Sequence, residues 1–387
     1  MKRLCFRAAF VLFFGWSSGF ASTNPAWLTR VWQTDDGLPD NNVSMVVQGA
    51  DGYLWIVTPA GLIRFDGESF SPFPIEDFTT WPVPHVRNVL CCRSGALWVA
   101  SDGGTLIGLN PDFSAIQFSQ AELPRRGPHA LAESADGSIW LGYTPWIGIS
   151  NSIYRIKGGK VTCFSKRDGL PEGPFYSMVA DGMGNVWAAK GKQLAVFRNG
   201  QFQNAASIRA GGACLGATHT NAVWFAAGTH LFKCDTQGTL RDCGLIFQGS
   251  ADFTVTALLE DSGGAVWIGT DGNGLFRYSA SGFERVDVSD SSILSLAEDR
   301  EGNVWAGTAG GGLDRICSRA IRLETVADNP VSSQLHSIAQ DSRGGVWGAT
   351  EDGMIVSRVD GRWEPRFTNQ PFAGTVTCVE ADHEDGI

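Results

Sequence analysis

Seven residues in variable loops have side chains that could recognise a small polar ligand. Two are indole rings that can stack on a sugar ring, one is an imidazole, and four carry oxygens that accept hydrogen bonds from hydroxyls. They are Trp81, His85, Asp102, Trp146, Asp271, Asn273 and Glu351. For the two tryptophans a plain loop-packing role is favoured over sugar stacking. Ordinary turn formation explains the four oxygen-bearing residues as well as ligand binding does, so all seven are candidates only.

The sequence offers no recognisable catalytic or metal-binding constellation. Its six histidines show no His-Glu-x-x-His pattern and no paired metal-ligand spacing. The segment 271–274 is too short for an EF-hand loop, and the glycines at 310–312 lack the Lys-Ser/Thr of a phosphate-binding loop. The one Gly-x-Ser-x-Gly match, at 15–19, falls in a predicted leader segment. We therefore expect no catalytic residue, no metal and no other cofactor.

Composition narrows the class of protein further. The chain has 387 residues and a net charge of −10, which argues against nucleic acid or an anionic membrane surface as a partner. It is rich in glycine (48) and tryptophan (14), and 43% of its residues are hydrophobic, enough for a sizeable core. A coiled coil, a disordered chain and a multi-span membrane protein are all excluded.

The first residues are typical of an export signal. Basic residues at 2, 3 and 7 precede an apolar run at 8–14, and Gly19 and Ala21 supply the small residues that a signal peptidase needs. A short buried helix is the alternative. No later stretch reaches the roughly 18 apolar residues of a membrane helix, so we expect a periplasmic, or otherwise extracytoplasmic, chain without membrane insertion once residues 1–21 are removed. Eight cysteines then remain, for which isolated thiols are favoured over bridges involving Cys91–Cys92 or Cys234 and Cys243.

A repeat of about 42 residues organises the rest of the chain. Its most regular feature is a tryptophan preceded by a branched aliphatic residue, with Gly or Asn three positions before the ring and, with one exception, a small residue two positions after it. The repeat tryptophans are Trp55, Trp98, Trp140, Trp187, Trp224, Trp267, Trp305 and Trp347.

Each repeat has the pattern of four short strands. In the clearest copy, the β-prone segments 255–260 and 265–270 flank a tight Asp/Gly turn, and 275–278 and 283–286 supply two more strands. Four strands in about 42 residues form one blade of a β-propeller, an all-β fold. We expect seven blades, with eight as the alternative, and tryptophans packed between neighbouring blades.

Several motifs together resemble the two-component regulator propeller repeat family. They are the segments 32–43, 51–55 and 61–67. Part of the first segment occurs again in Arg167-Asp168-Gly169-Leu170-Pro171. The resemblance implies the periplasmic sensor of a bacterial signalling protein that binds a small molecule, often an oligosaccharide, and signals by phosphorelay to a histidine kinase module of the same or a longer chain, beyond residue 387. Repeats two to five lack the family's Gly-Thr after the tryptophan, so we expect those blades to be irregular.

Domain limits follow from the repeat count. We assign 22–329 to the propeller sensor and 330–387 to the start of a second propeller or an eighth blade, truncated at the turn 381–387 before a tryptophan due near position 389. The segment Leu28 to Thr34 is expected to close the first ring by pairing within its last blade.

Candidate binding residues should share one end of the ring. In a four-stranded antiparallel blade, the second connection and the link to the next blade leave at the same end, and there the loops vary while the Asp/Gly turns at the other end are uniform. A ligand-binding sensor is the favoured function. A glycan-active enzyme is one alternative, because the turns resemble the Asp boxes of sialidases although no Tyr-Glu nucleophile pair is evident, and a passive protein-interaction scaffold is another.

Overall fold

The computed structural model describes residues 27–80, 83, 85–144, 153–208, 212–247, 253–319, 335–341, 343–350, 353–359, 362–366 and 378–380. The predicted signal peptide (1–21) and the C-terminal turn (381–387) lie outside these residues. The chain divides into two compact units, one formed by Ala26–Ser318 and the other by Met1–Pro25 with Arg319–Ile387.

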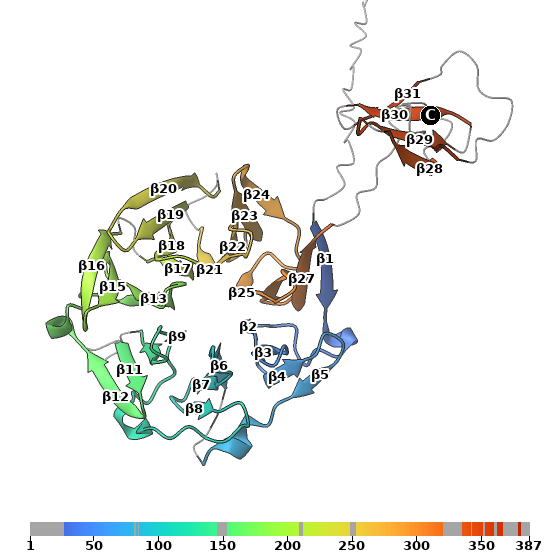
Figure 1. Ribbon diagram of the computed structural model, residues 1–387. Helices are drawn as coiled ribbons and strands as arrows, with labels where there is room; N and C mark the ends of the chain where they lie inside the picture. Colours follow the sequence, from blue (N-terminus) through green and yellow to red (C-terminus); the bar gives the residue numbers. More distant parts are fainter. Residues whose placement is uncertain are drawn as a thin grey trace, which may run out of the picture. The chain divides into compact units, whose positions relative to one another are not determined.

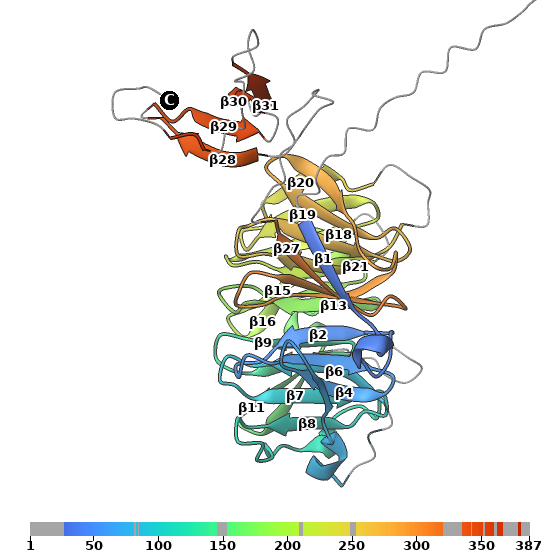
Figure 2. The ribbon, with the colours of Figure 1, turned by 90° about the vertical axis from the view of Figure 1, so that its right-hand side faces the viewer.

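The described part of Ala26–Ser318 is an all-β propeller, as the repeat predicts (Figure 1). Its innermost strands contact one another in turn around a closed ring. In ring order they are β2 (Met45–Gln48), β6 (Val86–Cys91), β9 (Ala130–Glu133), β13 (Phe175–Ala180), β17 (Cys214–Ala217), β21 (Val255–Glu260) and β25 (Ile293–Glu298). Figure 2 shows the same unit from the side.

Each inner strand begins an antiparallel sheet whose strands follow outward in chain order, except that the sheet beginning with β25 ends on the N-terminal strand. The outer strands are β3 (Leu54–Thr58), β4 (Gly61–Phe65), β5 (Phe70–Pro72), β7 (Leu97–Ser101), β8 (Leu106–Leu109), β10 (Ile139–Gly142), β11 (Ile153–Lys157), β12 (Lys160–Phe164), β14 (Val186–Lys190), β15 (Gln193–Arg198), β16 (Gln201–Ser207), β18 (Ala222–Ala227), β19 (His230–Asp235), β20 (Leu240–Leu245), β22 (Val266–Thr270), β23 (Leu275–Ser279), β24 (Gly282–Val286), β26 (Val304–Thr308) and β27 (Leu313–Ser318). Four short 3-10 turns, η1 (Thr34–Asp36), η2 (Ile75–Phe78), η3 (Gln120–Glu122) and η4 (Lys166–Asp168), lie in the connections.

Sheet regularity differs in part from the prediction. The clearest repeat forms β21 to β24 as expected. Of the four sheets expected to be irregular, only β6–β8 has fewer than four strands among the described residues, and the other three are complete. Two of these three still shift register once between outer strands, at β15–β16 and at β19–β20. The expectation is therefore wrong only for β9–β12, whose pairings are regular.

The N-terminal strand closes the ring. β1 (Trp27–Trp32) pairs antiparallel with β27 along its whole length, from Trp27 opposite Ser318 to Trp32 opposite Leu313. This confirms the pairing predicted for Leu28 to Thr34, with the strand beginning and ending slightly earlier. The last sheet thus takes three strands from the C-terminal end of the unit and one from the N-terminal end, and β1 covers the edge that β27 would otherwise expose.

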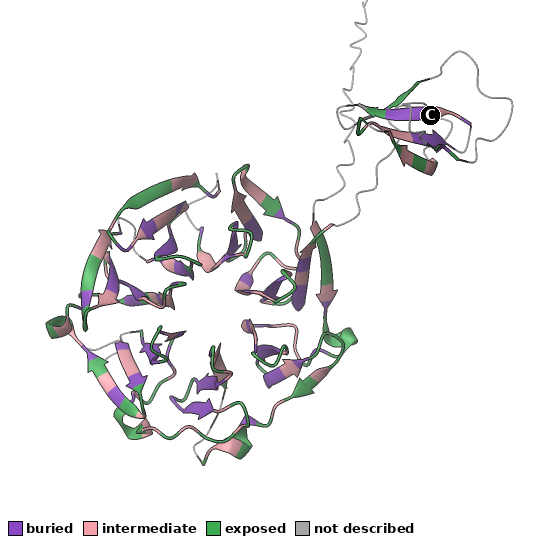
Figure 3. Ribbon diagram, in the orientation of Figure 1, coloured by how far each residue is buried: buried purple, intermediate pink, exposed green. Residues whose placement is uncertain are grey.

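The repeat tryptophans form the core, as predicted. All seven within the ring are buried, and Figure 3 shows that buried residues gather on the middle strands of the sheets. In three of the seven, a turn carboxylate six positions before the ring accepts the indole N–H: Trp187 donates to Asp181 at 2.8 Å, Trp267 to Asp261 at 2.8 Å and Trp305 to Asp299 at 2.7 Å. Trp140 donates instead to the Ser134 hydroxyl and Trp224 to Glu260 of the next sheet, both at 3.0 Å. The Asp181 carboxylate also accepts the backbone N–H of Asn185 at 3.0 Å, so one side chain shapes the turn and satisfies the buried indole.

Small residues two positions after the tryptophan let neighbouring sheets approach. A Cβ added at Gly142 would overlap the ring of Phe175 on the next sheet, and one at Gly269 would lie 2.7 Å from Ile293. The small residue is therefore required by sheet-to-sheet packing rather than by the strand itself.

The Gly-Leu-Pro motifs build two copies of one connection. In each, an aspartate accepts the backbone N–H that starts a 3-10 turn, Gln33 to Asp36 at 2.9 Å and Ser165 to Asp168 at 2.8 Å. A glycine then adopts a positive φ, and the leucine that follows is buried. This motif is structural.

The second unit contains one further sheet of the same order. It consists of β28 (Leu335–Gln340), β29 (Val346–Thr350), β30 (Ile355–Val359) and β31 (Arg362–Pro365). The indole of Trp347 donates to Asp341 at 2.8 Å, as in the ring. No helix among the described residues has the length and hydropathy to span a bilayer. The eight described cysteines are all free, but only Cys92 and Cys234 are buried, and Cys163 and Cys378 are exposed.

Candidate functional site

The second connection of each sheet and the link to the next sheet lie together at one end of the ring, here called the crossover end. Backbone hydrogen bonds join the two kinds of loop: the N–H of Asp102 donates to His85 O at 2.9 Å, and that of Asp271 donates to Thr254 O at 2.9 Å. The same bond recurs from Ala309 to Ser292 at 3.0 Å. The loops that vary in sequence are therefore held on a uniform backbone frame.

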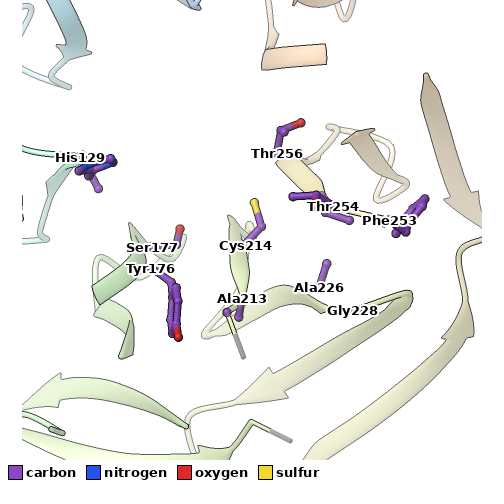
Figure 4. A pocket seen from close by; sticks show the side chains of 13 residues that line it. His129, Tyr176, Ser177, Ala213, Cys214, Ala226, Gly228, Phe253, Thr254 and Thr256 are labelled. Carbon is purple, nitrogen blue, oxygen red and sulfur yellow. The ribbon is translucent and has the colours of Figure 1, made fainter. Parts of the chain in front are cut away.

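A cavity of about 470 Å³ opens at the crossover end, where four inner strands begin (Figure 4). Its size suits a small ligand. The lining residues come from the starts of β9, β13, β17 and β21 and from the end of β18, and they are His129, Ala130, Tyr176, Ser177, Gly212, Ala213, Cys214, Ala226, Gly228, Phe253, Thr254, Val255 and Thr256.

One register position supplies a lining residue from each of these four sheets. It lies eleven residues before the repeat tryptophan, and around the ring it is occupied by Ser44, Arg87, His129, Tyr176, Ala213, Thr256 and Leu294. On four of the seven inner strands this residue is the extra one of a β-bulge. A bulge leaves one residue out of the pairing pattern and redirects its side chain, so the position can vary without disturbing the sheet.

The cavity side chains are mostly small, and six of the thirteen lining residues are polar. In Figure 4, Ser177 and Cys214 point into the space between His129 and Thr256, whereas the ring of Tyr176 points away from it. Burial raises the pKa of the Cys214 thiol to about 12, so this group stays protonated and is a poor nucleophile at neutral pH.

An arginine from the neighbouring sheet sets the charge beside the cavity. The guanidinium of Arg87 donates to the Asp102 carboxylate at 2.8 Å, and its other terminal nitrogen lies 3.0 Å from Nε2 and 3.2 Å from Nδ1 of His129. Burial, and then the charges of Arg87 and Arg126, hold the pKa of His129 below its usual range, while Asp102 acts in the opposite direction. The imidazole is thereby biased towards its neutral form.

The described candidates from the sequence lie at the crossover end but not in this cavity. His85 and Asp102 lie beside Arg87, on the β6–β8 sheet. Asp271 accepts the Ser292 hydroxyl at 3.0 Å, and Asn273 donates to the backbone oxygen of Asp271 at 3.3 Å. The sheets carrying these two groups are separated by two others on the shorter path around the ring, so the structure does not bring the groups together. Trp81, Trp146 and Glu351 lie outside the described residues, and the binding role of all seven stays a prediction.

Sequence reasoning missed the cavity residues because it examined loops and not strand starts. Counting eleven positions back from each repeat tryptophan would have found the lining residues His129, Tyr176 and Thr256, together with Arg87 beside His129. Within the described chain, no group of three or more His, Cys, Asp or Glu residues is arranged to hold a metal ion.

The class defined by this geometry is a β-propeller with a small polar cavity at the crossover end. Three segments of the sequence, 37–60, 249–272 and 287–310, match the model of the two component regulator propeller. The chain therefore carries repeats of that family, as the sequence motifs indicate. Curated proteins include no significant match to the sequence.

Solved structures with the same fold include two extracellular domains of putative hybrid two component systems from B. thetaiotaomicron. One has a TM-score of 0.60 at 18% identity and covers 93% of this chain and 51% of that domain. The other has a TM-score of 0.59 at 20% identity and covers 89% and 48%. This chain thus spans about half the length of either domain.

A virginiamycin B lyase from Staphylococcus aureus is also similar. Its TM-score is 0.60 at 14% identity, and the match covers 76% of this chain and 100% of the lyase. At these identities, likeness to the sensor domains and to the lyase alike establishes the fold alone.

Proposed function

We propose that this chain is the extracytoplasmic, periplasmic sensing region of a bacterial two-component signalling protein. Its ligand is a small molecule or an oligosaccharide, bound in the cavity at the crossover end, and its output is a histidine kinase module of the same or a longer chain. One observation carries the proposal. The position eleven residues before the repeat tryptophan holds a different side chain in different sheets, among them Arg, His, Tyr and Thr, although the surrounding backbone is the same in each.

A variable residue on a constant scaffold is the usual design of a recognition site. Four sheets meet at the cavity, so a ligand that contacts several of them can favour one relative arrangement of blades over another. Such a ligand shifts a signalling equilibrium only by the difference in its affinity for the two states.

An enzymatic role on glycans is the alternative that the cavity supports less well. His129 is the one imidazole among the thirteen lining residues, and it lies against the guanidinium of Arg87 rather than a carboxylate. A general base must accept a proton, and a neighbouring cation opposes this. A scaffold that binds only proteins would leave the polar lining without a role.

The test uses the purified chain with a panel of neutral and acidic oligosaccharides, followed by calorimetry for binding and by chromatography for the state of the glycan. We expect reversible binding of at least one glycan, which is recovered unchanged. Thr254→Trp should weaken that binding at least tenfold, because Thr254 is exposed at the cavity and an indole there fills the space.

Asn42→Trp is the matched control, since Asn42 has the same register position on the β2–β5 sheet and does not line the cavity. It should leave affinity unchanged. Recovery of a shortened glycan would show that the chain is an enzyme instead. If the chain binds none of the glycans and small molecules tested, the protein-interaction scaffold becomes the favoured function. If Thr254→Trp and Asn42→Trp bind the glycan with equal affinity, the ligand binds outside this cavity.

A further inference from the structure

The cavity is unlike the rest of the surface in its charge. The chain carries 40 acidic residues against 30 basic ones, yet none of the thirteen lining residues is Asp or Glu. On the His129 side of the cavity, the carboxylate of Asp102 is already paired with Arg87 at 2.8 Å. On the Thr254 side, the carboxylate of Asp271 accepts the Ser292 hydroxyl at 3.0 Å. The lining contains no Lys or Arg either, so the cation that an anion can meet is Arg87, beside His129, where the Asp102 carboxylate is already neutralised.

The contact between Arg87 and His129 leaves the imidazole able to bind a ligand. One guanidinium nitrogen lies within 3.2 Å of both ring nitrogens. The in-plane hydrogen-bonding directions of those two nitrogens diverge, so a single atom cannot satisfy both. Arg87 thus packs against the ring, and at least one imidazole nitrogen is directed elsewhere.

Hydroxyl groups complete the lining on the neighbouring sheets. The Ser177 hydroxyl accepts the backbone N–H of Leu215 at 3.3 Å, so its own proton can be donated to a ligand. The Thr256 hydroxyl donates to Ile293 O, which leaves its oxygen as an acceptor. One edge of the site therefore carries a cation and is formed by Arg87 and His129. The uncharged floor of the site carries the hydroxyl groups of Ser177 and Thr256.

We propose that this cavity takes a ligand that carries a carboxylate, either an acidic saccharide or a simple organic acid, with the carboxylate at the Arg87–His129 edge. The inference rests on the proposed ligand-binding function and adds the chemical class of the ligand. The remainder of the ligand lies along Ser177 and Thr256, where hydroxyl groups exchange hydrogen bonds with the uncharged floor.

Binding of a carboxylate should be linked to proton uptake by His129. The charged groups that face the imidazole are Arg87 from β6, Asp102 from the β7–β8 turn and Arg126 from the link before β9. Without ligand, burial and the two arginines disfavour the imidazolium form. An added carboxylate favours that form, so affinity for an acidic ligand should rise as pH falls from 8 to 6.

The experiment compares digalacturonate, its dimethyl ester and citrate by calorimetry on the full chain at pH 6 and pH 8. We expect digalacturonate or citrate to bind at least tenfold more tightly than the ester, and more tightly at pH 6. His129→Gln and Arg87→Gln should each remove most of this preference. Lys157→Gln removes an equal charge from an exposed ion pair with Asp136 in a turn at the other end of the ring, and should leave the preference intact.

The outcomes separate this inference from the proposed function. Binding of digalacturonate alone identifies an acidic saccharide, and binding of citrate with it identifies any small carboxylate. If the ester or neutral glycans bind as well as the acids, and Thr254→Trp abolishes that binding, the sensing function stands and the carboxylate inference is wrong. If no acid binds at either pH, the inference is likewise overturned. Thermal unfolding of each variant identifies any loss of folding. Arg87→Lys, which retains the charge, should retain part of the preference for acids over the ester.

Discussion

The guanidinium of Arg87 lies 3.0 Å from Nε2 of His129, although the two residues are 42 positions apart and belong to different sheets. Both occupy the position eleven before a repeat tryptophan. Adjacent repeats therefore place equivalent residues side by side at the crossover end, and the charge on one changes the protonation of the next.

This contact predicts opposite pKa changes in two variants. Replacing Arg87 with Gln removes a cation that disfavours the imidazolium form, so the pKa of His129 should rise. Replacing Asp102 with Asn removes an anion that favours it, so the pKa should fall further. Titration of the His129 Cε1 proton by NMR measures both.

The control for this pair is Lys157→Gln, whose charge lies in an exposed ion pair with Asp136 at the other end of the ring. It should leave the titration of His129 unchanged, because solvent screens distant exposed charges. A shift of the same sign in both the Arg87 and Asp102 variants would contradict the geometry described here.

The fold could be predicted because its signals are local and repeated. A glycine turn, a branched residue and a tryptophan at a fixed spacing specify a hairpin, and eight copies specify a propeller. Closure by β1 also followed, since a ring of sheets leaves one unpaired edge for the N-terminal strand to cover.

The cavity could not be predicted in the same way. Its position depends on bulges at Arg87, Tyr176 and Thr256, which alter the facing of one residue per strand without a composition signal in the sequence. The charge of the site depends on a contact between sheets, which no single repeat contains.

Removing a turn aspartate should destabilise the ring. Asp181 is buried and accepts the indole N–H of Trp187 at 2.8 Å, together with the backbone N–H of Asn185. Asp181→Ala leaves these donors without an acceptor, which costs about 1–3 kcal/mol for a single unsatisfied buried group. Urea unfolding followed by tryptophan fluorescence measures the loss.

Asp51→Ala is the comparison for that variant. Asp51 lies in the corresponding turn of the first repeat but is more exposed, and it pairs with Arg64 at 3.0 Å instead of an indole. An exposed ion pair contributes up to about 1 kcal/mol, so this variant should be the milder of the two. Equal losses would mean that the indole hydrogen bond adds nothing to stability.

A methyl group two positions after a repeat tryptophan should disturb sheet packing. A Cβ at Gly142 overlaps the ring of the buried Phe175, so Gly142→Ala should destabilise the chain by about 1–3 kcal/mol. Gly263→Ala is the control, because that glycine lacks a positive φ and its nearest neighbour is the end of the Asp261 side chain at 3.3 Å.

A double mutant separates packing from backbone effects. In Gly142→Ala with Phe175→Leu, the smaller side chain makes room for the methyl group, so the combined loss should be less than the sum of the single losses. Strictly additive losses from thermal or urea unfolding would place the cost of Gly142→Ala in the strand itself.

The register of ring closure can be tested with a cysteine that the chain already has. Leu28 on β1 lies opposite Cys317 on β27, 289 residues later, and the Cys317 thiol contacts Leu28 O at 3.7 Å. Leu28→Cys should therefore form a disulfide with Cys317 under mild oxidation. The cross-link closes a loop of nearly the whole ring, for which the chain-entropy limit is about 5 kcal/mol, so the unfolding midpoint should rise and fall back when the bond is reduced.

Thr29→Cys is the matched control, because its partner is Ile316 and alternate residues of a strand face opposite sides of the sheet. Mass spectrometry of the unreduced chain identifies the bond. A disulfide from position 29 but not from position 28 would mean that the register of β1 differs by one residue from the one described.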